Sequence, residues 1–129
     1  NNKFELEDGK EYSNHNDCYR TAVGYQRTRC LVSTPPGVGI CHSYRYMEPT
    51  RDKLLSEKFT RYMLSQPIRY LVKLRYNTRT FDSPAMLLVP KIDLNLLPDN
   101  FTDDDVFKLF NTPSSVRKTI EQIGHENPY

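Results

Sequence analysis

What the sequence lacks excludes several classes of protein at once. It contains no run of about 18 apolar residues, the length that a membrane-spanning helix needs, so no membrane span is predicted. Its three cysteines, Cys18, Cys30 and Cys41, leave one without a partner and form no C-x-x-C spacing. We therefore expect neither a disulfide framework nor a zinc site, with Cys41 and His42 at most half of a metal site. Reduced thiols are typical of a cytoplasmic or nuclear protein.

Catalytic motifs are missing as well. With only five glycines the chain has no glycine-rich phosphate loop, and it has no G-x-S-x-G elbow and no pair of acids spaced to share a site. The histidines, His15, His42 and His125, are far apart in the chain. We expect a binding domain that uses no cofactor, and a small hydrolase is the least favoured class. The start at Asn1 suggests a segment of a longer protein.

The net charge of +2 conceals an uneven distribution. Residues 19–79, which we call the basic centre, carry a net charge of +9, and the flanks carry −7. A block of this kind favours a polyanion, because each cation that meets a phosphate releases condensed counterions, although an ordinary solvated surface is the alternative. Its basic residues are Arg20, Arg27, Arg29, Arg45, Arg51, Lys53, Lys58, Arg61, Arg69, Lys73, Arg75 and Arg79.

Tyrosine is concentrated in the same segment. Seven of the nine tyrosines fall within the basic centre. Tyrosine interleaved with arginine suits unpaired nucleotides, because the ring stacks on a base while the hydroxyl or guanidinium binds a phosphate oxygen. Tyrosine is also a common strand residue with a buried ring, and the sequence does not separate the two roles. These residues are Tyr19, Tyr25, Tyr44, Tyr46, Tyr62, Tyr70 and Tyr76.

The periodicity of apolar residues predicts a mixture of strands and helices. Alternation predicts strands at residues 19–32, 40–47, 68–76 and 85–89. The first two are expected to form a hairpin through a turn at 33–39, which contains two prolines and two glycines. Thr50 is expected to cap a helix that buries Leu54, Leu55 and Phe59 and ends at Pro67.

Two further helices are predicted near the C-terminus. Thr102 begins one with a capping box and three carboxylates at its positive end, which we prefer over a metal site. Pro113 begins the other, at 114–123. The order predicts a small α+β fold with a curved sheet or OB-like barrel, an inserted hairpin and helix, and C-terminal helices. The expected organisation is an acidic lead-in without regular structure at 1–16, a binding domain at 17–98, and a helical connector packed on it at 99–129.

Several short motifs follow one another in a fixed order along the chain. The first strand carries Tyr-x-x-Ala-Val at 19–23, with Asp17 two residues before the tyrosine, and a Gln-Pro pair follows the central helix. A Leu-Val-Pro segment, a proline-containing loop, a helix and a Pro-Ser helix start come next. The segments are 17–23, 65–68, 88–90, 97–98, 107–110 and 112–116. In this order and at similar spacing they resemble the PAZ domain of Dicer-type ribonucleases, with Lys91 where the family has glutamate.

This resemblance implies a module that anchors the two-nucleotide 3′ overhang of double-stranded RNA, in a parent ribonuclease of small-RNA production and RNA interference. The family's tyrosine–arginine pair falls at Thr28 and Arg29, where only the arginine matches. One register of the helix puts Leu54, Leu55 and Phe59 at the family's tyrosines, and another retains Tyr62. The candidate RNA-binding residues are Tyr25, Arg27, Arg29, His42, Tyr44, Arg45, Tyr46, Lys58, Phe59, Arg61 and Tyr62.

A protein-interaction module is the alternative function. Its tyrosines would form a groove or cage, and its arginines would meet an acidic peptide. The dependence of binding on salt separates this function from RNA binding.

Overall fold

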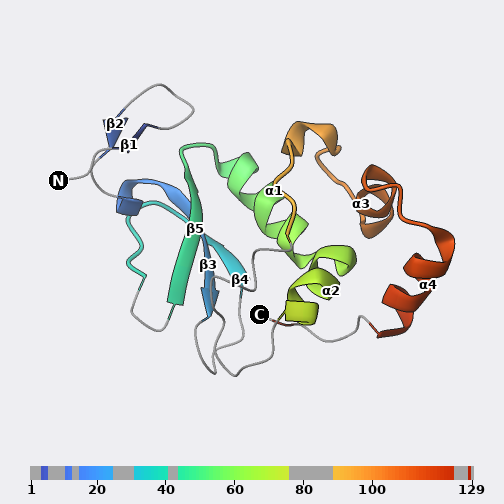
Figure 1. The fold of residues 1–129 in the computed structure, drawn as a ribbon. Helices are drawn as coiled ribbons and strands as arrows, with labels where there is room; N and C mark the ends of the chain where they lie inside the picture. Colours follow the sequence, from blue (N-terminus) through green and yellow to red (C-terminus); the bar gives the residue numbers. More distant parts are fainter. Residues whose placement is uncertain are drawn as a thin grey trace. The chain divides into compact units, whose positions relative to one another are not determined.

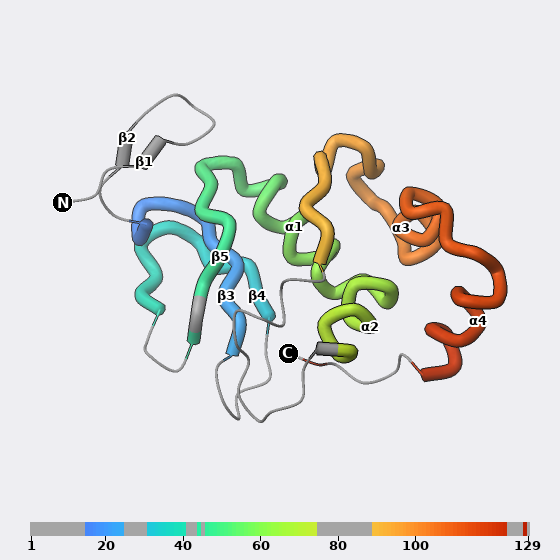
Figure 2. The backbone as a smooth tube through the Cα atoms, in the orientation of Figure 1, coloured from blue at the N-terminus to red at the C-terminus, as the bar shows by residue number. Residues whose placement is uncertain are grey.

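The computed structural model describes residues 4–5, 11–12, 15–24, 31–40, 44–75, 89–123 and 128, with the backbone alone at 4–5, 11–12, 45 and 75 (Figure 2). These residues form strands and helices in an α+β fold, which confirms the predicted class (Figure 1). The chain divides into two compact units, residues 1–60 and 61–128, and the boundary falls inside helix α1 (Lys53–Leu64). The domain boundaries proposed from the sequence, 1–16, 17–98 and 99–129, stay a prediction.

The first unit begins with a short pair of strands in the segment that we expected to have no regular structure. Strand β1 (Phe4–Glu5) pairs antiparallel with β2 (Glu11–Tyr12). A single turn of 3-10 helix, η1 (His15–Asp17), follows and leads into strand β3 (Tyr19–Gly24). Alternation is only one signal of a strand, and two-residue strands are too short to show it.

Strand β3 lies in the middle of a three-stranded sheet (Figure 1). It pairs antiparallel with β4 (Leu31–Thr34) on one side and with β5 (Tyr44–Thr50) on the other. The predicted strand 19–32 is therefore two strands, and the turn at 33–39 joins the two outer strands instead of closing a hairpin. Within the described residues the sheet is open and does not close into a barrel.

Strand β5 continues beyond the predicted stop at residues 48–50 because it contains an irregularity. Between the pairs Tyr19–Thr50 and Thr21–Met47, β5 contains one more residue than β3. Glu48 lies there with φ of 51°, in the left-handed region. An extra residue of this kind bends a strand and lets pairing resume.

Helix α1 covers one face of the sheet, and hydroxyl groups from both elements meet at their contact. Ser56 and Thr60 are buried, and their side-chain oxygens lie 2.9 Å from those of Ser33 and Thr21, respectively. Leu54, which the periodicity placed in the core, is 72% exposed. The prediction for Leu54 is wrong because the strands opposite α1 offer hydroxyl groups where the helix period alone suggests apolar partners.

Asp52, and not Thr50, caps α1. The Asp52 carboxylate accepts a hydrogen bond from the backbone N–H of Leu55 at 3.2 Å. Thr50 acts one step earlier, because its hydroxyl accepts from the backbone N–H of Asp52 at 3.0 Å. The two residues together form the turn that ends β5 and begins the helix.

The second unit contains helix α2 (Gln66–Arg75) where a strand was predicted at 68–76. Ile68 and Val72 are fully buried, whereas Leu74 is 60% exposed. Burial at a spacing of four residues is the helical pattern, so the alternation from Ile68 to Leu74 is coincidental. Pro67 lies in the first turn, where a missing N–H costs nothing, and therefore does not prevent a helix.

The remaining elements are η3 (Leu94–Leu96), which was not predicted, and α3 (Asp103–Leu109) and α4 (Ser114–Ile123), which were. Thr102 donates to the Asp105 carboxylate through its backbone N–H, at 2.8 Å, and through its hydroxyl, at 3.2 Å. The capping box and the helix at 114–123 are confirmed. Helix α2 contacts both α3 and α4.

Candidate nucleic-acid interface

The sheet has one face directed toward α1 and one directed away from it. Thr21 and Ser33 lie on the α1 side, since their hydroxyls meet that helix. Side chains alternate along a strand, so Ala22 and its pairing partners Val32 and Tyr46 lie on the opposite face. Val32 is 45% exposed and Tyr46 is 44% exposed.

Two of the predicted RNA contacts come together on this second face. Tyr44 and Tyr46 are two residues apart on β5, so both side chains project from the side away from α1. Tyr46 is exposed and Tyr44 is half-buried. We call this side of the sheet, which carries the buried Ala22 together with Val32, Tyr44 and Tyr46, the aromatic face.

A buried arginine lies on the same side of β3 as Ala22. Arg20 is 0% exposed, although it carries a full charge. Its guanidinium donates to the side-chain oxygen of Asn16 at 2.8 Å and to the backbone carbonyls of Pro35 at 3.3 Å and Val38 at 2.5 Å. Arg20 thus attaches the proline-containing turn to β3. As a buried structural residue it is not one of the cations of the basic centre that a phosphate can reach.

Tyr46 is held by side chains from two other elements. The Arg20 guanidinium carbon lies 5.9 Å from the centre of the Tyr46 ring. His15 Nδ1 lies 2.7 Å from the Tyr46 hydroxyl, and the two rings meet edge to face at 83° with centroids 5.4 Å apart. An exposed aromatic ring fixed in this way is preorganised for stacking, because little side-chain freedom is left to lose.

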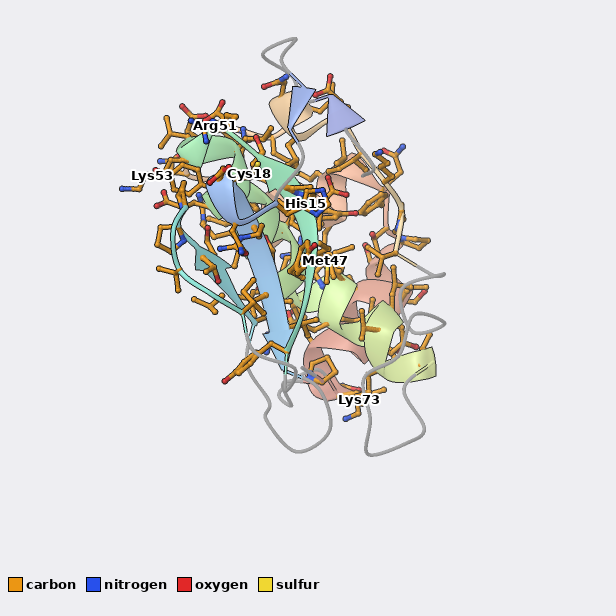
Figure 3. The ribbon with its side chains drawn as sticks, turned by 90° about the vertical axis from the view of Figure 1, so that its left-hand side faces the viewer. His15, Cys18, Met47, Arg51, Lys53 and Lys73 are labelled. Atoms are coloured by element: carbon orange, nitrogen blue, oxygen red, sulfur yellow. The ribbon has the colours of Figure 1, made fainter. Side chains whose placement is uncertain are left out.

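Exposed cations lie at the end of the sheet where η1 and α1 begin. Arg51 donates a hydrogen bond to the backbone carbonyl of Asp17, which brings an exposed guanidinium beside η1. Lys53 is also exposed, and its Nζ lies 3.9 Å from Oε1 of Glu57. Figure 3 shows Arg51, Lys53 and Cys18 at the same end of the sheet, with His15 beside β5. Cys18 is completely buried.

The first unit also contains Lys58 and Phe59 of the predicted set. Both side chains are half-buried on α1. They belong to the helix that covers the other face of the sheet, so the first unit does not place them on the aromatic face. Their role in RNA binding stays a prediction.

Arg61, in the second unit, is hydrogen-bonded to the backbone of residues 99 and 101. Its guanidinium donates to the carbonyls of Asp99, at 2.5 Å, and Phe101, at 2.7 Å. The same group stacks on the Phe101 ring at 4.5 Å. Through these contacts Arg61 holds residues 99–101 against α1.

Tyr62 is in the core of the second unit. It is 1% exposed, and its hydroxyl donates to the carbonyl of Pro90 at 2.7 Å. Burial raises the pKa of Tyr62 to about 12. This placement favours the core role, which the helix spacing left open, over the role of a phosphate contact.

Several candidates lie outside the described residues: Tyr25, Arg27, Arg29, His42 and the side chain of Arg45. The predicted strand at 85–89 lies outside them except at its last position. Among the residues that the structure describes, no three acidic, histidine or cysteine side chains gather as a metal site would require. No helix among them has the length and apolar character to cross a membrane.

Comparison with known proteins gives no family assignment. No family model matches the chain, and no significant match is found among curated proteins or solved structures.

The sequence missed two residues that build the aromatic face. Arg20 counted as one more cation, although its place on a strand next to Thr21 and Ala22 was a signal that it could be buried. His15 is 31 residues from Tyr46, and nothing in the sequence connects the two. Only the return of β5 alongside β3 brings them into contact.

Proposed function

We propose that the chain is an RNA-binding module of PAZ-like type, which anchors the 3′ end of double-stranded RNA. The observation that carries this proposal is the aromatic face: Tyr44 and Tyr46 project from one side of a sheet within a segment of net charge +9. An unpaired terminal nucleotide offers a base to stack on a tyrosine ring and a phosphate for a neighbouring cation. Recognition would depend on the shape of the end and not on base sequence.

The motifs shared with Dicer-type PAZ domains support this proposal. They suggest that the module serves a longer ribonuclease of small-RNA production, in the cytoplasm or nucleus, and that it contributes binding and no chemistry. That family has an OB-like barrel. The described strands of this chain form an open sheet, so a closed barrel is likewise a proposal.

A module that binds peptides is the second candidate, and the surroundings of Tyr46 restrict it. A cage for a cationic side chain needs a negative potential at the face of each aromatic ring. The Arg20 guanidinium carbon lies 5.9 Å from the centre of the Tyr46 ring, and its positive charge opposes a second cation there. The remaining form of this function is capture of an acidic peptide.

A polarisation assay with three versions of one short RNA duplex tests the proposal. The duplexes carry a two-nucleotide 3′ overhang, a blunt end, or an overhang blocked at its 3′ terminus. We expect the open overhang to bind best, with affinity falling steeply as salt rises. Equal affinity for all three would reduce the site to a general basic surface, and tighter binding of an acidic peptide would favour the second candidate.

A pair of variants connects this result to the aromatic face. Tyr46→Ala removes an exposed ring, so affinity for the overhang should fall by about five- to hundredfold, the range for one base stacked on an aromatic side chain. Leu96→Ala is the matched control, because Leu96 is 64% exposed on η3 in the other unit. Equal affinities of these two variants would move the site away from Tyr46.

A further inference from the structure

The contact between His15 and Tyr46 gives the aromatic face a titratable group. His15 belongs to η1 and Tyr46 to β5, and Nδ1 and the hydroxyl oxygen are 2.7 Å apart. A hydroxyl has one proton to donate and lone pairs to accept with. The direction of this one hydrogen bond therefore decides what the Tyr46 hydroxyl can offer to a ligand.

The two protonation states of the imidazole give opposite results. If the neutral ring carries its proton on Nε2, Nδ1 is an acceptor and takes the Tyr46 proton. The hydroxyl then presents only lone pairs to a ligand, and these repel a phosphate oxygen. When the imidazole is protonated, Nδ1–H donates to the Tyr46 oxygen, and the Tyr46 proton becomes available for a phosphate.

The environment of His15 favours the neutral imidazole. Burial, and after it the positive charge of Arg20, lower the pKa of His15 from its usual value. Arg20 reaches it from β3, where it is buried and fixed by three hydrogen bonds. Its own element carries Asp17, and β5 carries Glu48 and Arg45, of which Arg45 is described by its backbone alone. Arg51, which follows β5, donates to the Asp17 carbonyl. A bound phosphate would add negative charge and favour protonation.

We infer that His15 is the positioning residue for Tyr46, and that its protonation turns the Tyr46 hydroxyl into a hydrogen-bond donor toward an RNA phosphate. This inference rests on the proposed RNA binding and adds a regulatory property to the same site. His15 acts through Tyr46 and does not itself contact the ligand. Binding of RNA is then coupled to uptake of a proton, so affinity rises as pH falls.

The test is the pH dependence of RNA affinity, measured between about pH 5.5 and 8 at constant salt. The probe is a duplex with a 3′ overhang of two uridines, whose bases and phosphodiesters do not titrate in this range. We expect the parent chain to bind about three- to tenfold more tightly at the acidic end, the size expected of one additional hydrogen bond. His15→Gln, which can still bond to Tyr46 but cannot be protonated, should lose this gain, and His125→Gln should keep it.

A second variant separates the hydroxyl from the added charge. Tyr46→Phe keeps the ring and the imidazole but has no hydroxyl to reorient, so most of the acidic gain should disappear. Melting temperatures at pH 8 establish that each variant is folded. Nitrogen chemical shifts of His15 in the free chain should show the proton of the neutral ring on Nε2.

The outcomes distinguish this inference from the function beneath it. If no duplex binds at any pH, the proposed function fails and the inference fails with it. If the overhang binds but His15→Gln or Tyr46→Phe shows the full gain of the parent chain, the inference alone is overturned. A proton on Nδ1 in the neutral ring would overturn it as well, since the hydroxyl would then be a donor at every pH.

Discussion

The side-chain oxygens of Thr21 and Thr60 lie 2.9 Å apart in the interior of the first unit, where strand β3 meets helix α1. Thr60 gives its proton to the carbonyl of Ser56, at 3.0 Å, so Thr21 must be the donor between the two threonines. Both residues are buried, at 0% and 7% exposure. A hydrogen bond between two buried hydroxyl groups thus connects the sheet of the aromatic face to helix α1, at a place that water does not reach.

Removing the Thr60 hydroxyl alone should cost more than removing both hydroxyls. Thr60→Val preserves shape but leaves the Thr21 hydroxyl buried without a partner, which should lower the free energy of unfolding by about 1–3 kcal/mol. The double variant Thr21→Val with Thr60→Val should recover most of that loss. Denaturant unfolding of the two single variants and the double variant measures the coupling. Additive losses would mean that the two hydroxyls do not interact.

Tyr62→Phe should destabilise the chain without weakening RNA binding. The change removes the hydrogen bond to the Pro90 carbonyl, worth about 1 kcal/mol, from a side chain that is 1% exposed. In an absorbance titration of tyrosinate, the parent chain should show a tyrosine that ionises near 12, and Tyr62→Phe should lack it. Weaker RNA binding with an unchanged melting temperature would instead return Tyr62 to the binding site.

Variants of Arg61 and Lys58 should distinguish a cation of α1 that supports the fold from one that is predicted to bind RNA. Arg61→Ala removes the donor to the Asp99 and Phe101 carbonyls and should lower the free energy of unfolding by about 1–2 kcal/mol. Arg61→Lys should restore only part of it, because an ammonium lacks the planar fork. Lys58→Ala should reduce RNA affinity by more than Arg61→Ala does, because the Arg61 guanidinium is already bonded to two carbonyls. A larger loss of affinity in Arg61→Ala would exchange the two roles.

The stability of the free chain should rise with pH across the range where histidine titrates. The pKa of His15 is lowered in the folded state, so the unfolded chain binds more protons near and below pH about 6.5, and acidification destabilises the fold. His15→Gln should flatten this slope of melting temperature against pH. Acidification should therefore weaken the free fold while it strengthens RNA binding, a combination that simple acid unfolding would not produce.

A second loss of stability should appear only in stronger acid. Hydrogen bonds from Arg117 and Lys108 lower the pKa of Asp104, so the stability that they give is present above the usual range of an aspartate and is lost as pH falls through the lowered value. Asp104→Asn should remove this acid-dependent part and leave the slope due to His15. A slope near neutral pH that disappears in Asp104→Asn would contradict the separation of the two groups.

The sequence by itself determined the helices whose signals are local. The capping box at Thr102 and the helix at 114–123 depend on contacts between residues close in the chain, and the structure has both. The helix between Thr50 and Pro67 was also found, as α1, since apolar residues recur there at helical spacing. Composition similarly identified the segment of net charge +9, because charge needs no partner to be counted.

The tertiary structure decided everything that depends on residues far apart in the chain. Alternation at 68–76 suggested a strand, yet Ile68 and Val72 are both buried on helix α2. Helix α2 contacts α3 and α4, and this packing stabilises a helix with one apolar face. The burial of Arg20 requires the turn at Pro35 and Val38, and the orientation of Tyr46 requires His15 from η1. A sequence states which groups are present, but the pairing of β5 with β3 decides which of them meet.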